Sequence, residues 1–213
     1  MALELGVNDF RAVLDDLASV FEENKAYLNE LDAKIGDGDH GLSMARGFAR
    51  VKRHADETAP ESITGLLTEG GMQFNEEAGS TIGILMFSAM RAAGKAVAGG
   101  DSVGLEELAA MLEAAVEAIS KRGKAHVGQK TILDSLHPAL EALRAGLETG
   151  EVEADVVRRA VQAAADGVER TRGMKAGIGR AKWFAERTRG ELDPGAVSGH
   201  LIVKAFGDRL LGG

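Results

Sequence analysis

Three aspartates and a histidine stand within one short segment, Asp32-Ala-Lys-Ile-Gly-Asp37-Gly-Asp39-His40. Carboxylates this close to one another are unfavourable unless a positive charge lies between them. Mg²⁺ supplies such a charge, because it takes oxygen ligands and binds through a few carboxylates together with the phosphates of a ligand. We therefore interpret Asp32, Asp37 and Asp39 as metal ligands. The alternative is a solvated Asp-Gly turn that holds no ion.

Other sites known for acidic or glycine-rich loops do not fit this segment. Residues 36–41 match the pattern G-x-G-x-x-G, but a dinucleotide fingerprint follows a strand, whereas an amphipathic helical stretch precedes this loop. An EF-hand that starts at Asp37 or Asp32 needs an acid at its twelfth position, where the sequence has Phe48 and Ser43. A P-loop is excluded as well, because G-x-x-x-x-G-K-[ST] does not occur.

A second candidate segment, Ser80-Thr81-Ile82-Gly83, directly precedes an apolar helical stretch. Backbone amides at the start of a helix bind phosphate, and the helix dipole favours an anion there. The alternative is a simple N-cap formed by Ser80 or Thr81. Because the acidic segment occurs in the same chain, we favour phosphate binding at Thr81 and Ile82.

Three more segments are candidates with weaker signals. The stretch from Gly123 to Thr131 is interpreted as a flexible connection that carries Lys130, and Asp193-Pro194-Gly195 is typical of a turn. Arg180 lies in a basic stretch, and a guanidinium group suits bidentate contact with phosphate. The alternatives are a plain connection between helices and a solvated arginine. We interpret Trp183 as a packing residue.

Helical periodicity dominates the rest of the sequence, and no segment alternates convincingly with a period of two. The apolar residues predict eight helices, with stripes over residues 10–31, 48–51, 63–74, 80–97, 105–119, 133–147, 157–168 and 201–210. We therefore expect an all-α, antiparallel up-and-down bundle without a sheet. Glycines cluster at residues 36–41, 78–83, 123–128 and 173–179. Alternate connections of such a bundle emerge at the same end, where we expect the chemistry.

Composition limits the function further. The chain has 213 residues, a net charge of −8 and no cysteine, so we expect a single domain over residues 1–213 without disulfides or thiolate metal sites. A negative balance disfavours a nucleic-acid partner. The apolar run from Ile82 to Met90 is too short for a membrane span, which needs about 20 residues. The N-terminus does not resemble a signal peptide, and we expect a cytoplasmic protein.

With these motifs the sequence resembles the L subunit of dihydroxyacetone kinase, the nucleotide-binding partner in a kinase of two or three proteins. The matching motifs are Asp32…Asp37-Gly-Asp39-His40-Gly41, Arg122-Gly123-Lys124-Ala125…Gly128-Gln-Lys130-Thr131-Ile132-Leu-Asp134, Gly179-Arg180-Ala181…Glu186-Arg187 and Asp193-Pro194-Gly195-Ala196. They cover most of the chain. The resemblance implies an eight-helix antiparallel barrel with a nucleotide pocket at one end.

The resemblance also implies which residues form the site. Asp32, Asp37 and Asp39 would bind two Mg²⁺ ions that bridge the phosphates of ADP or ATP. The nucleotide-binding residues implied at matching positions are His40, Gly41, Leu42, Ser43, Thr81, Ile82, Gly123, Ile132, Arg180, Asp193, Pro194 and Gly195. The sequence departs from the usual family pattern at Ile82, where a serine is common, so one side-chain donor is lost.

By this resemblance we expect a phosphotransferase subunit that presents a phosphoryl group to dihydroxyacetone, or a related small ketose, held by a separate K-type subunit. In one branch of the family ATP exchanges freely, and in the other bound ADP is recharged by a phosphotransferase-system protein; both remain open. The alternative function is a non-catalytic nucleotide-sensing module that binds a transcription factor. A third possible function is that of a metal-stabilised helical scaffold.

Overall fold

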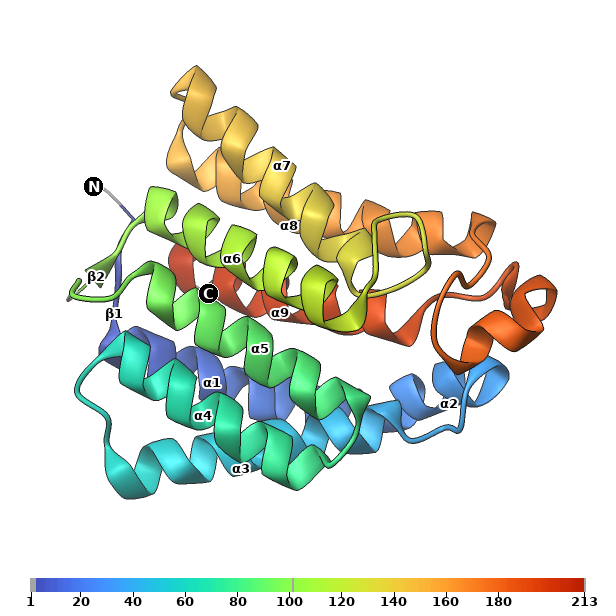
Figure 1. The fold of residues 1–213 in the computed structure, drawn as a ribbon. Coiled ribbons are helices and arrows are strands. Elements are labelled where there is room, and N and C mark those ends of the chain that lie inside the picture. The colour runs from blue at the N-terminus through green and yellow to red at the C-terminus, as the bar shows by residue number, and fades with distance from the viewer. Residues whose placement is uncertain (1–2, 101, 213) are drawn as a thin grey trace.

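Helices make up almost all of the fold (Figure 1). The computed structural model describes residues 3–100 and 102–212, apart from the side chains of Ile35, Arg180, Ala181 and Phe184. The all-α class is confirmed. The exact barrel arrangement stays a prediction. Over the residues described, none of the helices combines the length and the apolar character that a membrane crossing requires.

Most α-helices of the described chain follow one another with short connections, and the one between α8 and α9 is longer. Their bounds are α1 (Val7–Glu23), α2 (Lys25–Ile35), α3 (His40–Thr58), α4 (Ile63–Ala78), α5 (Thr81–Ala96), α6 (Leu105–Gly123), α7 (Leu133–Thr149), α8 (Glu153–Arg170) and α9 (Pro194–Leu211). Two 3₁₀ segments, η1 (Thr171–Gly173) and η2 (Arg180–Thr188), lie between α8 and α9.

Two details of the predicted fold were wrong. The stripe over residues 10–31 is two helices, because the chain leaves the helical conformation at Asn24, whose side-chain amide donates to the Val20 carbonyl at 2.8 Å. The same carbonyl also accepts from the Asn24 backbone amide at 3.0 Å, and side-chain bonds to a carbonyl four residues back often bend a helix. A short antiparallel pair is also present, in which β1 (Leu5–Gly6) pairs with β2 (Ser102–Val103). Two residues are too few to give an alternating pattern in the sequence.

The helices pack mainly on their neighbours in the sequence, and α9 returns to pack on α1. Stacked and edge-on rings form part of the core between α1, α3 and α4, with Phe21 against Phe48 at 4.9 Å and Phe48 against Phe74 at 5.1 Å. Gly47 permits this packing, since a Cβ there would lie 2.4 Å from the Phe74 ring. Phe10 and Phe206 join α1 to α9, with ring centroids 5.5 Å apart.

The four glycine-rich connections emerge at one end of the bundle. In Figure 1 the links α2–α3, α4–α5, α6–α7 and α8–α9 all lie on the right, where α2 also contacts η2. This arrangement follows from the alternating direction of successive helices. It gathers the sequence motifs that were candidates for chemistry, although they are far apart in the chain.

Candidate functional site

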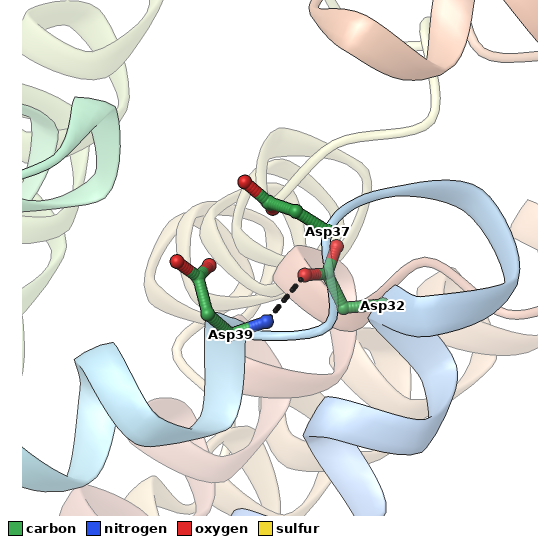
Figure 2. A group of neighbouring side chains, drawn as sticks. All are labelled: Asp32, Asp37 and Asp39. Atoms are coloured by element: carbon green, nitrogen blue, oxygen red, sulfur yellow. Dashed lines mark hydrogen bonds between the residues drawn. The ribbon is translucent and has the colours of Figure 1, made fainter.

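The three aspartates converge at this end of the bundle. Asp32 lies in the last turn of α2, while Asp37 and Asp39 lie in the loop that leads into α3. One carboxylate oxygen from each residue lies within 4.8 Å of the other two. The loop folds around Asp32, whose Oδ2 accepts hydrogen bonds from the amides of Gly38 at 2.9 Å, Asp39 at 3.1 Å and His40 at 3.3 Å. Figure 2 shows the three side chains and the bond from Asp39.

Glycines make this tight loop feasible. Gly38 has φ = 79°, in the left-handed region that other residues avoid. A Cβ at Gly36 would lie 2.3 Å from Oδ1 of Asp32. A Cβ at Gly41 would lie 2.2 Å from the Lys25 carbonyl oxygen, so the first turn of α3 packs directly on the backbone of α2. A side chain at Gly36 would displace the Asp32 carboxylate, and one at Gly41 would push α3 away from α2.

The acidic group fits a divalent cation. Oxygen ligands on opposite sides of an octahedral Mg²⁺ lie about 4.2 Å apart, because each metal–oxygen bond is about 2.1 Å. The carboxylate oxygens here lie within 4.8 Å of one another. A small movement of the exposed Asp37 or Asp39 toward the half-buried Asp32 would therefore bring them to the distance that the ion requires. Over the part of the chain that the structure describes, no other group of three His, Asp or Glu side chains converges in this way.

His40 joins the acidic loop to the last helix. It is the first residue of α3, and its Nε2 lies 2.8 Å from the Ser198 hydroxyl on α9. Burial lowers the pKa of His40 to about 4, although the Asp32 carboxylate raises it, so the ring is neutral near pH 7. A neutral ring suits binding better than acid catalysis at neutral pH. The sequence analysis missed Ser198, because only the packing of α9 on α3 brings it here.

A second part of the site forms where α9 begins. A Cβ at Gly195 would lie 3.2 Å from the Ile132 amide nitrogen, so Ile132 and Gly195 are direct neighbours. The interpretation of Asp193-Pro194-Gly195 as a turn was wrong, because these residues start α9. Asp193 is its N-cap, with Oδ2 accepting from the Ala196 amide at 2.7 Å, and Pro194 occupies the first turn. The same residue types favour turns and helix starts.

Buried charges underlie this second part. The side chains of Lys130, Asp134 and Asp193 belong to buried residues. Burial raises the pKa of Asp193 to about 7, against the attraction of Lys130. The interpretation of residues 123–131 as a flexible connection was wrong for Lys130, which is only 3% exposed.

The other predicted residues occupy the same end of the bundle, with different surroundings. Thr81 is exposed at the start of α5, and the N-cap Ser80 makes no side-chain capping hydrogen bond in the described structure. Ile82 packs against the core. Gly123 ends α6, where its Cβ position would lie 3.4 Å from Leu85 of α5.

The sequence analysis made one prediction each for Arg180 and Trp183, both of which lie in η2. The backbone of Arg180 begins this segment, but its side chain is outside those described, so its contact with phosphate stays a prediction. The interpretation of Trp183 as a packing residue was wrong, because this residue is 85% exposed. A short 3₁₀ segment at the end of the bundle leaves its ring outside the core.

Comparison with known proteins assigns the family. The sequence profile of the DAK2 domain matches residues 34–208, which include Asp37 and Asp39 but not Asp32 and reach into α9. The chain belongs to the DAK2 domain family. It is similar to the ADP-binding subunit DhaL of PEP-dependent dihydroxyacetone kinase 1 from Listeria innocua, with 37% identity over 91% of each chain.

Longer kinases contain a similar region. This DAK2 domain is 36% identical to the L-erythrulose 1-kinase of Mycolicibacterium smegmatis, over 93% of this chain and 35% of that protein. The crystal structure of the dihydroxyacetone kinase from C. freundii in complex with AMP-PNP and Mg²⁺ superposes with a TM-score of 0.70 and 26% identity. The match covers 93% of this chain and 33% of that one, so the DAK2 domain here spans about a third of these longer kinases.

An apolar cavity inside the bundle is a different feature from the acidic end. Its volume is about 170 Å³, and residues such as Leu112, Ile119, Val161 and Phe206 line it. No Asp, Glu, Lys, Arg or His of the described residues is among those that line it. Phosphate groups need charged or polar partners, so the cavity of this DAK2 domain does not suit a nucleotide.

Proposed function

We propose that this chain is the ADP-binding subunit of a dihydroxyacetone kinase. The observation that carries the proposal is the convergence of Asp32, Asp37 and Asp39 at one end of the bundle in a chain of this family. A relative that matches over 91% of both chains is named as such a subunit. The acceptor we propose is dihydroxyacetone or a related small ketose, and the name of the L-erythrulose 1-kinase supports including four-carbon ketoses.

Charge neutralisation is the main task that the acidic loop would perform. A nucleoside triphosphate carries a charge of about −4 and the three carboxylates add −3, so direct contact would be strongly repulsive. Two Mg²⁺ ions would return +4, hold the phosphates in place and stabilise the charge that develops during phosphoryl transfer. We propose Asp32, Asp37 and Asp39 as their ligands.

The remaining site residues would hold the nucleotide around this centre. We propose that the phosphates lie between the first turns of α3 and α5, which carry His40–Ser43 and Thr81–Ile82, because amides at helix starts favour anions. Arg180 would add a positive charge. The adenine would lie between Gly123 and Ile132, with Asp193–Gly195 beside it, since Gly195 adjoins Ile132.

Phosphoryl transfer in this proposal needs two partners. A separate K-type subunit would hold the ketose at the open end of the bundle, near Asp39 and Thr81. Bound ADP would be recharged by a phosphotransferase-system protein, because the relative of nearly equal length is named PEP-dependent. The proposed compartment is the cytoplasm.

The proposal is tested by reconstitution. The purified chain should bind Mg–ADP in calorimetry, lose that binding with EDTA, and phosphorylate dihydroxyacetone negligibly by itself. Adding the K-type subunit and the phosphoenolpyruvate-driven donor proteins of the Listeria relative should produce dihydroxyacetone phosphate. Phosphorylation by the chain alone at about 1 per second would contradict the subunit assignment. Mg–ADP binding without activity in the full mixture would favour a nucleotide-sensing role instead.

A further inference from the structure

One buried lysine organises the long connection between α8 and α9. We call residues Thr171–Glu191 the strap; it contains η1 and η2 but no α-helix. It is long for a bundle, in which connections between helices usually have about 2–8 residues. The strap lies at the end of the bundle that carries the acidic loop, and η2 packs on α2.

The Lys130 ammonium group gathers three points of the strap. Its Nζ donates to the carbonyl oxygens of Thr171 at 2.8 Å, Thr188 at 2.7 Å and Glu191 at 2.5 Å. An ammonium group has three donors, so all of them are used. These carbonyls are the beginning of the strap, the end of η2 and the last strap residue, and the lysine therefore closes the strap into a loop.

The chain around Lys130 is built to hold it in place. Lys130 has φ = 62°, a left-handed conformation that is uncommon for a residue with a side chain. Asp134 accepts hydrogen bonds from the amides of Gly128 at 2.5 Å and Thr131 at 2.7 Å, which fixes the backbone on both sides. The Gly177 amide of the strap donates to the Gln129 carbonyl at 3.0 Å. A strained backbone that its surroundings hold in this way often serves a functional site.

The strap joins both parts of the candidate site. It carries Arg180, and its last residue lies two positions before the N-cap Asp193. The Glu191 carboxylate also pairs with Lys34 at 2.9 Å, on the helix that carries Asp32. A strap that came loose would therefore release Arg180 and the start of α9 together.

We propose that Lys130 is a positioning residue for nucleotide binding, which holds the strap closed through its three bonds to the carbonyls of Thr171, Thr188 and Glu191. The inference rests on the proposed function, because it assigns the lysine to that same site. Lys130 does not touch the nucleotide in this proposal. It acts through the strap and through Asp193.

The experiment compares Lys130→Met, which keeps the length of the side chain and removes its donors, with Lys204→Met as a control. Lys204 is exposed on α9 and, among the described residues, forms its ion pair along the helix with Asp208, so this control loses one positive charge as well. Trp183 is the only tryptophan of the chain and lies in the strap. Its fluorescence anisotropy therefore reports on strap motion without a label.

Three measurements are made well below the melting temperature. In Lys130→Met the Trp183 anisotropy should fall, trypsin should cleave within residues 172–190 at least tenfold faster, and Mg–ADP should bind at least tenfold more weakly. Lys204→Met should match the wild type in all three. A folded Lys130→Met with wild-type anisotropy, cleavage and affinity would overturn the proposal, even if its melting temperature were lower.

A second variant covers the case in which Lys130→Met does not fold. Lys130→Arg keeps the charge, but the guanidinium donors lie in one plane and cannot meet three carbonyls that converge on one point. This variant should show the same three changes, and wild-type values in a folded Lys130→Arg would overturn the proposal. The anisotropy and cleavage measurements use the chain without ligand. If the wild type bound no Mg–ADP, the proposed function would fail while these two measurements still decided whether Lys130 closes the strap.

Discussion

The acidic loop lies at the same end of the molecule as Lys130 with its three carbonyl partners, which we call the strap anchor. The two regions arrange their charges in opposite ways. The loop brings three negative groups together near the surface, and hydrogen bonds from amides six to eight residues away hold Asp32. The anchor buries one positive group and surrounds it with carbonyls from residues 41, 58 and 61 positions away. A cluster of carboxylates favours the binding of a cation, whereas a buried lysine with all its hydrogen bonds made favours one fixed conformation. The first region is thus suited to ligand binding and the second to positioning.

The largest expected effect is at the loop. Changing Asp37 or Asp39 to Asn should weaken Mg-dependent ADP binding at least a hundredfold, about 2.7 kcal/mol, because a ligand charge is lost. The free energy of unfolding without Mg²⁺ should change much less than this, because both residues are exposed. Calorimetry with Mg–ADP and chemical denaturation in EDTA measure the two quantities.

Asp56→Asn is the matched control for these variants. Asp56 is an exposed aspartate on α3 that pairs with Lys52 at 3.5 Å, away from the loop. Its Mg–ADP affinity should equal that of the wild type. Unchanged affinity in both Asp37→Asn and Asp39→Asn would show that the cation binds elsewhere.

The next effect tests the buried charges beside the anchor. Burial raises the pKa of Asp193 from 3.8 to about 7. The neighbouring carboxylates of Asp134 and Asp32 also raise this pKa, whereas the Ala196 amide and Lys130 lower it. The folded state therefore holds a proton that the unfolded state releases, and this stabilisation is lost as the pH rises from about 4 through about 7. The slope approaches 1.4 kcal/mol per pH unit, so about 2 kcal/mol should disappear between pH 5 and pH 7.

Asp193→Asn isolates this contribution, because asparagine is also a good N-cap but does not titrate. The difference in the free energy of unfolding, variant minus wild type, should increase by about 2 kcal/mol from pH 5 to pH 7. Urea denaturation in EDTA measures it without interference from bound metal. A difference that stays constant with pH would mean that Asp193 is ionised throughout this range.

Two glycines test the close packing behind each region. A Cβ at Gly41 would lie 2.2 Å from the Lys25 carbonyl behind the loop, and one at Gly167 would lie 2.2 Å from the Asp134 carbonyl behind the anchor. Each change to Ala should lower the free energy of unfolding by about 1–3 kcal/mol through overpacking. Gly41→Ala should also weaken Mg–ADP binding, and Gly167→Ala should lower the Trp183 anisotropy. Gly173→Ala, where a Cβ would have open space, is the control and should be close to neutral in denaturation.

The smallest effect is expected where the two regions meet. Lys34 on α2 pairs with Glu191 at the end of the strap, and both side chains are partly exposed. Exposed ion pairs contribute little to stability, so the coupling energy from the double-mutant cycle of Lys34→Met and Glu191→Gln should be small and decrease in high salt. A large coupling that persists in high salt would mean that this pair, as well as Lys130, holds the strap.

How well the sequence predicts each region depends on how far apart in the chain the contacting residues are. The acidic loop could be predicted because Asp32, Asp37 and Asp39 are near one another in the chain and glycines between them permit a tight bend. The all-α class was equally accessible, since helical periodicity repeats over long stretches. The grouping of the four connections followed from the alternation of helix directions, without any knowledge of side-chain contacts.

The remaining features depend on contacts that a sequence does not display. Lys130 looks like any lysine in a glycine-rich link, and only the fold brings three distant carbonyls to its ammonium group. The helix break at Asn24 coincides with one side-chain hydrogen bond, to the Val20 carbonyl. The residue types of Asp193-Pro194 suit a turn and a helix start equally. Trp183 has a large apolar side chain of the kind that usually packs, but it lies on a segment that leaves its ring exposed.

The return of α9 to α1 has a consequence for how the chain folds. Most helix pairs join neighbours in the sequence, which is a low contact order and favours rapid formation of helical hairpins. The Phe10–Phe206 contact and the ion pair between Asp16 and Arg209 at 2.9 Å join opposite ends of the chain instead. Closing so long a segment costs more conformational entropy than any neighbouring pair. We therefore expect the α1–α9 seam to form last in refolding and to open first in hydrogen exchange, ahead of the hairpin formed by α4 and α5.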